Sequence, residues 1–270
     1  MTTSGTLDQG ALPAFVHINK TAGSTMKFVL RNSLCLRYCN LISREPMTAD
    51  DGDLEFARRV YRFGLRCVSG HDLRGPSDRI ATPLQRFTIL RDPTRRCLSH
   101  YLHRKRVASR GGRDLTLPRF LRRDGVRDLQ TRMIAGAPDV ERAKQELEDY
   151  LFVGLTEHFD ESLLAFASLS PFPVRLAYER RHVTGSTSER DEILADPASL
   201  RQLEQANELD QQLYDFVRDD LYPRLLAEAA KRPELASTEI AELDGPTLRY
   251  TVGRRFQLGI YAHLAKRRRR

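Results

Sequence analysis

Short apolar segments that alternate with helical patterns are the feature that most restricts the fold of this chain. Each segment is rich in β-branched or aromatic side chains and is followed by a stretch with helical periodicity. Strands that alternate with helices form parallel βαβ units, and the helices cover both faces of the sheet. The sequence therefore predicts a three-layer α/β fold with a central parallel sheet flanked by helices. The expected strands lie at 14–18, 66–69, 87–90 and 151–155, with a further candidate at 174–177.

Length and composition are those of a globular protein. The chain has 270 residues, of which 40% are hydrophobic and 30% charged, so it can bury a sizeable core. We expect a single domain over residues 1–230 and a C-terminal extension over residues 231–270 with a basic tail. A run of like charges usually lies in solvent, so residues 266–270 are predicted to form a solvated tail.

Two segments in the second half of the chain predict secondary structure but contain no functional motif. Residues 180–191 are polar and rich in Ser, Thr and Arg, which predicts a loop. Residues 203–229 have the periodicity of a long amphipathic helix, in which Pro223 favours a break.

The net charge of +8 comes with an excess of arginine along the whole chain. Arginine pairs with phosphate, sulfate and carboxylate, so an anionic ligand is indicated: a nucleotide, an acidic glycan or a nucleic acid. No apolar run approaches the roughly 20 residues that span a bilayer, and the first ten residues lack the apolar stretch of a secretory signal. We therefore expect no transmembrane segment and a cytoplasmic protein.

The four cysteines do not predict a metal site. Cys35 and Cys39 can share a helix face, but Cys67 and Cys97 do not form the second close pair of a zinc site. In a reducing compartment such cysteines are free thiols, and we expect no bound metal.

The segment from His17 to Met26 has the pattern of an anion-binding turn. A strand ends, a short loop with Gly23 follows and a helix begins, so free N–H groups and the helix dipole favour an anion. Lys20 adds a positive charge, and Ser24 and Thr25 add hydroxyl groups. The segment lacks the Gly-Lys-Ser/Thr of a Walker A loop. An ordinary βα turn with a capping serine is the alternative interpretation.

A second candidate phosphate site follows the third predicted strand. Arg91 stands at the end of that strand, Pro93 suits the first turn of a helix, and Ser99 lies about two turns into it. Arg91 can make a bidentate contact to a phosphate, and Ser99 can donate a hydroxyl group. The alternative is a basic surface helix in which Asp92 serves only as a cap.

The two segments together resemble the donor-binding motifs of sulfotransferases. Both follow predicted strands, at the edge where open α/β sheets bind ligands. The segment at 20–25 resembles the 5′-phosphosulfate loop for 3′-phosphoadenosine-5′-phosphosulfate (PAPS), and the segment at 91–101 resembles the 3′-phosphate motif. The resemblance implies a P-loop-like fold and PAPS as the donor. It assigns donor binding to Lys20, Thr21, Ala22, Gly23, Ser24, Thr25, Arg91 and Ser99.

Within the sulfotransferases, the pattern is closest to a carbohydrate branch that includes heparan sulfate 2-O-sulfotransferases, and to its bacterial relatives. The resemblance runs from Phe15 to Leu226, with weaker matching segments at 128–132, 153–157 and 207–214. Two departures stand out: we expect no membrane anchor, unlike in the Golgi members, and the residues after Lys231 match no family segment.

His71 is the candidate catalytic base. The segment at 68–71 resembles the strand end that carries the base in the 2-O-sulfotransferase group, and an imidazole accepts protons near neutral pH. A loop histidine without a catalytic role is the alternative. Glu157 also follows a predicted strand and is the reserve candidate, whereas His17 lies within a strand and is expected to pack in the core.

The sequence thus predicts a PAPS-dependent sulfotransferase whose acceptor hydroxyl lies on a carbohydrate or other small molecule. By analogy with phosphoryl transfer, Lys20 would neutralise the charge on the bridging oxygen as 3′-phosphoadenosine-5′-phosphate (PAP) leaves. His71 would take the acceptor proton. An ATP-dependent kinase is one alternative, although a full Walker A loop and a carboxylate pair for Mg²⁺ are missing. An arginine-rich nucleic-acid-binding protein is the other; because its aromatic stacking residues are missing, we expect no nucleic-acid partner.

Overall fold

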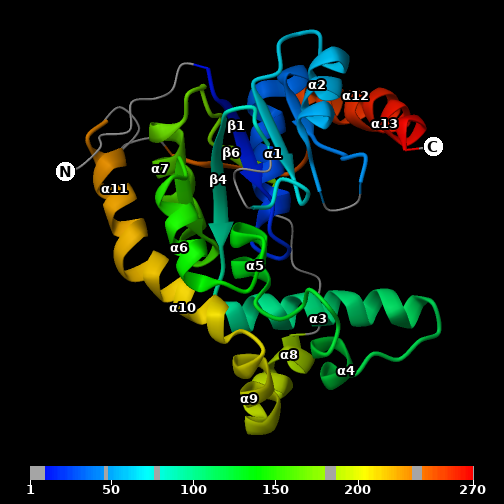
Figure 1. Ribbon diagram of the computed structural model, residues 1–270, viewed down its shortest axis with the longest axis vertical. Helices are drawn as coiled ribbons and strands as arrows, with labels where there is room; N and C mark the ends of the chain where they lie inside the picture. Colours follow the sequence, from blue (N-terminus) through cyan, green and yellow to red (C-terminus); the bar gives the residue numbers. More distant parts are fainter. Residues whose placement is uncertain (1–9, 46–47, 76–79, 180–186, 233–238, 270) are drawn as a thin grey trace.

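The fold is built on a five-stranded parallel sheet in a computed structural model that describes residues 10–45, 48–75, 80–179, 187–232 and 239–269. The strands pair in the order β2-β3-β1-β4-β5, and every pair is parallel. Helices flank this sheet, so the predicted α/β fold is confirmed (Figure 1). The strands are β1 (Leu12–Val16), β2 (Tyr38–Asn40), β3 (Cys67–Gly70), β4 (Leu84–Leu90) and β5 (Phe152–Leu155).

The position of β1 in this order decides where a ligand can bind. β1 lies between β3 and β4, with Val16 beside Gly70 and Phe15 beside Phe87. The chain leaves β1 towards α1 and reaches β3 on one side and β4 on the other, so β1 marks a switch in strand order. Open α/β sheets bind ligands at the carboxyl ends of the strands beside such a switch.

Helices on both sides of the sheet complete the core. Helix α1 packs against β2 and β3, whereas α7 and α11 pack against β5 at the other edge of the sheet. Figure 1 shows α2 and α12 on the same side of β4 as α1, and α6, α7 and α11 on the other side. The helices are α1 (Gly23–Leu34), α2 (Asp51–Val60), α3 (Pro93–Arg110), α4 (Leu117–Leu121), α5 (Leu129–Ala135), α6 (Val140–Glu148), α7 (Phe159–Leu169), α8 (Thr187–Ala195), α9 (Pro197–Gln205), α10 (Glu208–Phe216), α11 (Tyr222–Ala230), α12 (Leu248–Phe256) and α13 (Ala262–Arg268).

The fifth strand of the central sheet is not the predicted one. The segment expected at 174–177 contributes only to β6 (Ala177–Glu179), which pairs with β7 (Ala241–Leu243) in a separate two-stranded sheet. The central sheet instead uses β2, whose three residues are too few to give an apolar pattern in the sequence. The loop expected at 180–191 was also wrong in part, because α8 begins at Thr187; residues 180–186 lie outside the described residues.

The long helix expected over 203–229 is interrupted where α9 ends at Gln205 and α10 begins at Glu208, but Pro223 does not break the part that runs from α10 into α11. A five-residue π turn (Val217–Leu221) precedes α11, and the Tyr222 N–H donates to the Val217 carbonyl, five residues earlier. Proline lacks the N–H of a regular helix, and a π turn before it shifts the hydrogen-bond pattern so that the helix continues. The expected break therefore takes the form of a local change in helix type.

The C-terminal helices pack on the same core as the rest of the chain. A π turn (Gln257–Tyr261) joins α12 to α13, and Tyr261 and Ala265 belong to the main apolar cluster. Arg268 forms an ion pair of 2.6 Å with the buried Asp53, and the Arg269 Nε donates to the Ser43 carbonyl. The prediction of a solvated tail is therefore wrong at these two positions, because the helix carries their side chains to acceptors on the domain.

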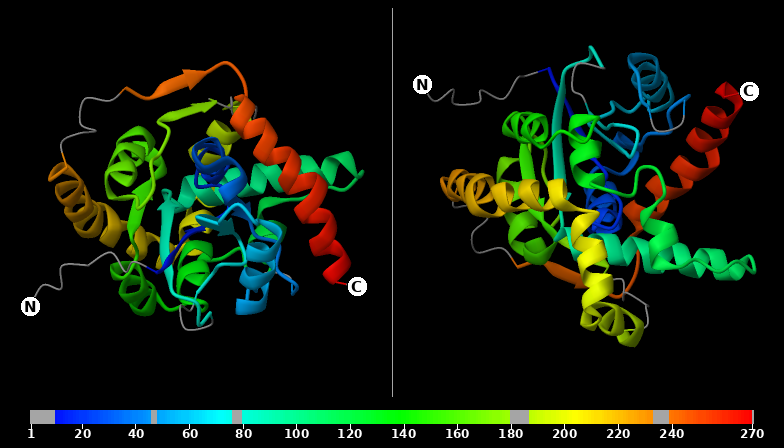
Figure 2. Two further views of the ribbon diagram at one scale, coloured as in Figure 1. Left: turned by 90° about the horizontal axis from the view of Figure 1, so that it is seen from above. Right: turned by 60° about the horizontal axis from the view of Figure 1, so that its bottom comes forward.

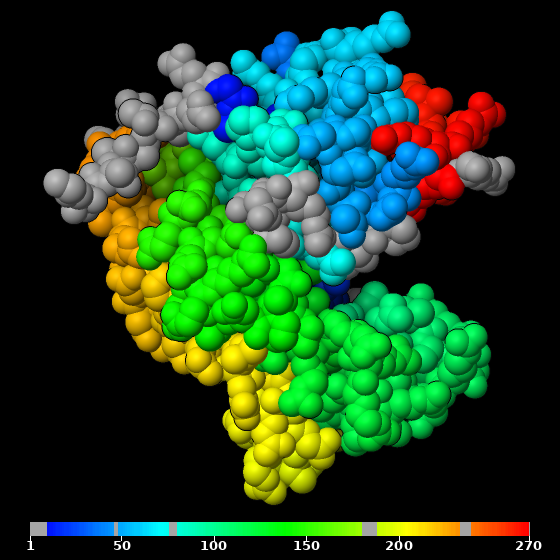
Figure 3. Space-filling view, in the orientation of Figure 1, coloured from blue at the N-terminus to red at the C-terminus, as the bar shows by residue number. Residues whose placement is uncertain are grey.

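A second, smaller core lies between α3, α4 and α9 and supports an arm that projects from the sheet (Figure 1). Leu98, Tyr101, Phe120 and Leu203 are among its buried members. The space-filling view shows the surface hollowed between this arm and the part of the chain near residue 50 (Figure 3). None of the described helices is both long and apolar enough to cross a bilayer.

Candidate active site

The loop between β1 and α1 has a backbone shape that exposes N–H groups. Lys20 and Ala22 both adopt positive φ, at 72° and 58°, and Ala22 precedes the first residue of α1. Thr21 between them is buried, and its hydroxyl donates to the Ile18 carbonyl at 3.1 Å. Each non-glycine residue in this conformation costs about 1–3 kcal/mol, a strain that is found mainly at functional sites.

The N–H groups of this loop fit an anion. Among the described residues, no acceptor is recorded for the backbone N–H groups of Ala22, Gly23 and Ser24. The Thr25 N–H already donates to the Ala22 carbonyl at 2.9 Å, so Thr25 can offer a ligand only its hydroxyl. Successive free N–H groups at the start of a helix form a concavity that binds phosphate or sulfate. The residues present therefore fit the 5′ end of a phosphosulfate nucleotide.

Gly23 allows α1 to begin against the ring of His17. A Cβ at Gly23 would lie 2.0 Å from the His17 Cδ2, which no real contact allows. His17 cannot move away, because it is 7% exposed and its ring stacks on Phe15 and on His71. His17 was expected to be a core residue within a strand; it is buried, but it follows the last residue of β1.

Replacing Gly23 with alanine should therefore displace the anion-binding loop. We expect the free energy of unfolding to fall by about 1–3 kcal/mol, the usual result of overpacking, and PAP binding to weaken. Chemical denaturation and calorimetry with PAP measure the two effects. Gly245→Ala is the matched control, since nothing lies within 4 Å of a Cβ at that position. Equal behaviour of the two variants would contradict the role given to Gly23.

His71 follows the last residue of β3 and faces the same loop from one side. Its Nδ1 lies 2.5 Å from the His17 carbonyl oxygen. A carbonyl only accepts, so Nδ1 carries the proton and the lone pair is on Nε2. Burial lowers the pKa of His71, which keeps the ring neutral over more of the pH range. The arrangement gives an imidazole that is fixed at one nitrogen and free to accept a proton at the other.

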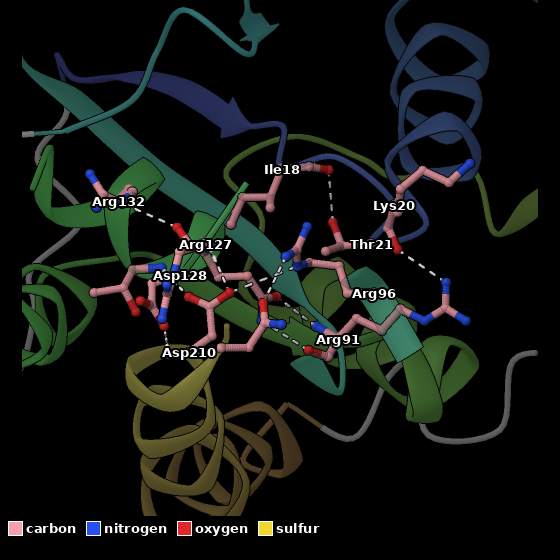
Figure 4. A network of polar contacts seen from close by, with 12 residues as sticks. Ile18, Lys20, Thr21, Arg91, Arg96, Arg127, Asp128, Arg132 and Asp210 are labelled. Atoms are coloured by element: carbon pink, nitrogen blue, oxygen red, sulfur yellow. Dashed lines mark hydrogen bonds and ion pairs between the residues drawn. The ribbon is translucent and has the colours of Figure 1, made fainter. Parts of the chain in front are cut away.

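Arg91 reaches the loop from the other side, after the last residue of β4. Its NH1 donates to the Lys20 carbonyl at 3.2 Å (Figure 4). The side chain of Gln130 holds its backbone, accepting from the Arg91 N–H at 3.0 Å and donating to the Arg91 carbonyl at 2.9 Å. The Arg91 Nε is buried and has no partner among the described residues, so the guanidinium keeps a free donor.

Two aspartates hold Gln130 in place by capping each other's helices. Asp210, on α10, accepts from the Gln130 and Thr131 N–H groups at the start of α5, at 3.1 and 2.8 Å. Asp128, before α5, accepts from the Leu209 and Asp210 N–H groups at the start of α10. A carboxylate at a helix N-terminus binds free N–H groups and opposes the helix dipole. The reciprocal caps fix α5 and α10 against each other.

Arg96 of α3 completes this network and lies just above Arg91 in the view of Figure 4. Its side chain and that of Asp210 are both 0% exposed, with 3.8 Å between the Arg96 Nε and the Asp210 Oδ2. The Arg96 NH2 also donates to the Asn207 Oδ1 at 3.1 Å. From the sequence, residues 128–132 and 207–210 were identified only as segments that resemble a family. The structural roles of Arg96, Gln130 and Asp210 were not predicted.

Ser99 and Lys20 are the two predicted donor residues that remain. Ser99 is half-buried on α3, and no hydrogen bond of its hydroxyl is recorded among the described residues. The Lys20 side chain points away from the Arg91 guanidinium (Figure 4). Burial lowers the pKa of Lys20, and the positive charges of Arg91 and Arg106 lower it further. This concentration of positive charge favours a ligand with several negative charges.

Glu157, the reserve candidate for the base, is engaged elsewhere. It follows β5, and its two carboxylate oxygens accept from the Asp92 N–H at 3.2 Å and from the Tyr214 hydroxyl at 3.1 Å. β5 pairs with β4 only, so Glu157 lies on the Arg91 side of the loop and His71 on the other. Within the described residues, no cluster of His, Cys, Asp and Glu has the arrangement of a metal site.

Comparison with known families places these residues in context. The family model described as the sulfotransferase family matches residues 14–217. The match runs from β1 into the π turn before α11, so it includes the anion-binding loop, His71, Arg91 and Asp210. A search among curated proteins finds no match.

Proposed function

Because the chain belongs to the sulfotransferase family, we propose that it transfers the sulfuryl group of PAPS to an acceptor hydroxyl on a carbohydrate and releases PAP. One observation carries the proposal. The backbone of a single loop accepts a hydrogen bond from each of the two predicted functional side chains. The His17 carbonyl accepts from His71, and the Lys20 carbonyl accepts from Arg91. The candidate base and the candidate phosphate-binding arginine are thereby fixed relative to the anion-binding N–H groups.

The donor would bind across the carboxyl ends of β1 and β4. The free N–H groups of Ala22, Gly23 and Ser24 suit the 5′-phosphosulfate, with the Thr25 hydroxyl beside them. Thr21 supports the loop, because its buried hydroxyl is bonded to Ile18. Arg91 and Ser99 would hold the 3′-phosphate, which distinguishes PAPS from other adenine nucleotides.

The transfer itself needs one new bond, one broken bond and one proton acceptor. The acceptor oxygen forms a bond to sulfur, and the bond between sulfur and the bridging oxygen of the 5′-phosphate breaks. Nε2 of His71 takes the proton of the acceptor hydroxyl. The Lys20 ammonium offsets the negative charge that develops on the bridging oxygen as PAP leaves. Positioning and charge stabilisation thus supply most of the catalysis, as in phosphoryl transfer.

A carbohydrate acceptor is supported by the sequence resemblance and by the open surface near the site. The hollow between the α3 arm and the part of the chain near residue 50 leaves room for an extended molecule (Figure 3). Incubation with labelled PAPS and a panel of sugars, phenols and alcohols tests this point. Transfer to phenols but to no sugar would reject the carbohydrate part of the proposal.

Arg91→Ala should weaken PAP binding and change the affinity for 5′-AMP little. Losing a charge-assisted contact to the 3′-phosphate should cost about 1.5–3 kcal/mol, which is roughly a 10- to 150-fold loss in affinity. Calorimetry with both nucleotides measures the difference. Arg110→Ala, at the far end of the α3 helix that follows Arg91, is the control and should bind PAP like the wild type.

The donor proposal also fails if the wild-type protein binds PAP and AMP equally well. Melting temperatures with PAP, ATP and an oligonucleotide separate the proposal from a kinase and from a nucleic-acid-binding protein. The largest increase should occur with PAP. An increase with ATP or the oligonucleotide alone would favour one of those alternatives.

A further inference from the structure

The outer face of the C-terminal helix combines exposed apolar side chains with positive charge. α12, the π turn and α13 form one helix from Leu248 to Arg268. Residues 248–270 contain eight lysines and arginines and no acidic residue. Figures 1 and 2 show this helix at the periphery of the molecule, near α2 and uncovered on its outer side.

One row of residues, spaced by four, attaches the helix to the domain. Gly253, Gln257, Tyr261 and Ala265 are all buried. Gln257 bonds to the Asn40 N–H and carbonyl, and the Tyr261 hydroxyl accepts from the Ile42 N–H. In an α-helix, each residue is displaced by roughly 40° around the helix axis relative to the residue four positions earlier. The wider π turn rotates the chain back, so the row stays on the domain along the whole helix.

The adjacent row is apolar, and all of its members except Phe256, which packs against the core, are exposed. Leu248, Val252, Ile260 and Leu264 are 79%, 40%, 48% and 39% exposed, and Leu258 on the opposite flank is 57% exposed. These are five of the seven large hydrophobic side chains that are exposed among the described residues. Such a concentration on one helix marks an interaction surface, because monomeric proteins usually scatter their exposed apolar residues.

Cations neighbour this apolar row. Arg255 and Arg267 lie three residues after Val252 and Leu264, a spacing that brings side chains together on a helix surface. Arg254, Arg255, Lys266 and Arg267 are exposed, and the structure records no ion pair for any of them with the residues it describes. Arg268 and Arg269, in contrast, are bonded to the domain. The face therefore offers unpaired positive charge beside apolar side chains.

We propose that this face, formed by Leu248, Val252, Leu258, Ile260 and Leu264 with Arg254, Arg255, Lys266 and Arg267, docks the protein on an anionic membrane surface. An interfacial helix inserts its apolar side chains at the boundary of the acyl chains, and its Lys and Arg side chains bind anionic headgroups. A two-fold contact between two copies of the chain through this face would place cations against cations, which disfavours a dimer. The inference does not depend on the proposed function.

A single tryptophan gives a direct test of insertion. The chain contains no tryptophan, so Leu248→Trp places the only indole on the outer face. Its emission should shift to shorter wavelength with vesicles of phosphatidylcholine and phosphatidylserine, and not with phosphatidylcholine alone. Val107→Trp, at a 49% exposed position on α3, is the control and should not shift. Absence of a shift at Leu248→Trp with anionic vesicles at low salt would overturn the proposal.

Vesicle co-sedimentation of the full chain tests the two kinds of side chain separately. Arg255→Gln/Arg267→Gln should lower partitioning onto the mixed vesicles roughly 30-fold, because each cation near the surface contributes about fivefold. Val252→Ser/Leu264→Ser should lower it by about tenfold or more. Arg142→Gln/Arg201→Gln removes the same charge from exposed positions on α6 and α9 and should bind like the wild type. The thermal melting temperature of each variant checks that the domain is folded.

Three other results would contradict membrane docking and indicate a different explanation for this face. Equal loss of vesicle binding in Arg142→Gln/Arg201→Gln would mean that net charge alone acts. Binding to heparin or to an oligonucleotide that depends on Arg255 and Arg267, without vesicle binding, would identify a soluble polyanion. Self-association in analytical ultracentrifugation that Val252→Ser/Leu264→Ser abolishes would identify a second copy of the chain.

Discussion

Replacing His71 with alanine should lower kcat by about 10²–10⁴-fold and leave PAP affinity nearly unchanged. The variant loses the proton acceptor for the acceptor hydroxyl, but the donor contacts of Arg91 and the β1–α1 loop remain. Steady-state kinetics with labelled PAPS, and calorimetry with PAP, measure the two quantities. Lys20→Ala should behave differently, because Lys20 acts on the donor: PAPS binding and kcat should fall together.

His158→Ala is the matched control for this experiment. His158 is an exposed histidine that follows β5, and its replacement should leave kcat unchanged. If His71→Ala retained most of the wild-type kcat, His71 would not be the base. Glu157→Gln would then be the next variant to measure, although the hydrogen bonds to Asp92 and Tyr214 already occupy that carboxylate.

The pH profile of the wild type provides a second readout of His71. The neutral imidazole is the active form, so the rate should fall on the acid side as the ring becomes protonated. Burial lowers the pKa of His71 from the ordinary value of 6.5. The midpoint in kcat/KM for PAPS, which reports the free enzyme, should therefore lie below 6.5. This acid limb should be missing in His71→Ala.

Asp210→Ala should lower the free energy of unfolding by about 3–5 kcal/mol. The variant leaves the guanidinium of Arg96 buried without its counter-charge, and both side chains are 0% exposed. It also removes the cap from the Gln130 and Thr131 N–H groups. Chemical denaturation measures the loss. PAP binding of the folded fraction should weaken as well, because Gln130 no longer holds the backbone of Arg91 in place.

Asp219→Ala provides the contrast between a buried and an exposed ion pair. The Asp219 carboxylate is 62% exposed and pairs with Arg218, so its removal should cost less than about 1 kcal/mol. A loss at Asp210→Ala as small as that at Asp219→Ala would show that the network around Arg96 does not stabilise the fold. The double variant Asp210→Asn/Arg96→Met should recover part of the stability, since it leaves no unpaired buried charge.

The sequence by itself determined the local elements and the order of the functional segments. The strand expected at 151–155 corresponds to β5, and the helix predicted to start at Pro93 is α3. Both results follow from signals within a few neighbouring residues, namely apolar periodicity and a proline in the first turn. Because Lys20, His71 and Arg91 each come soon after a predicted strand, a parallel sheet was enough to predict that they meet at one edge.

The tertiary structure alone decided which side chains hold that edge together. Asp210 caps a helix 80 residues earlier, and Asn207 bonds to Arg96 across 111 residues. The contact of His17 with Gly23, the place of β2 in the sheet and the attachment of Arg268 to Asp53 are also set by packing. Polar contacts between distant residues leave no periodic pattern in a single sequence. They form only when the sheet order has brought their helices together, so they could be read only from the folded chain.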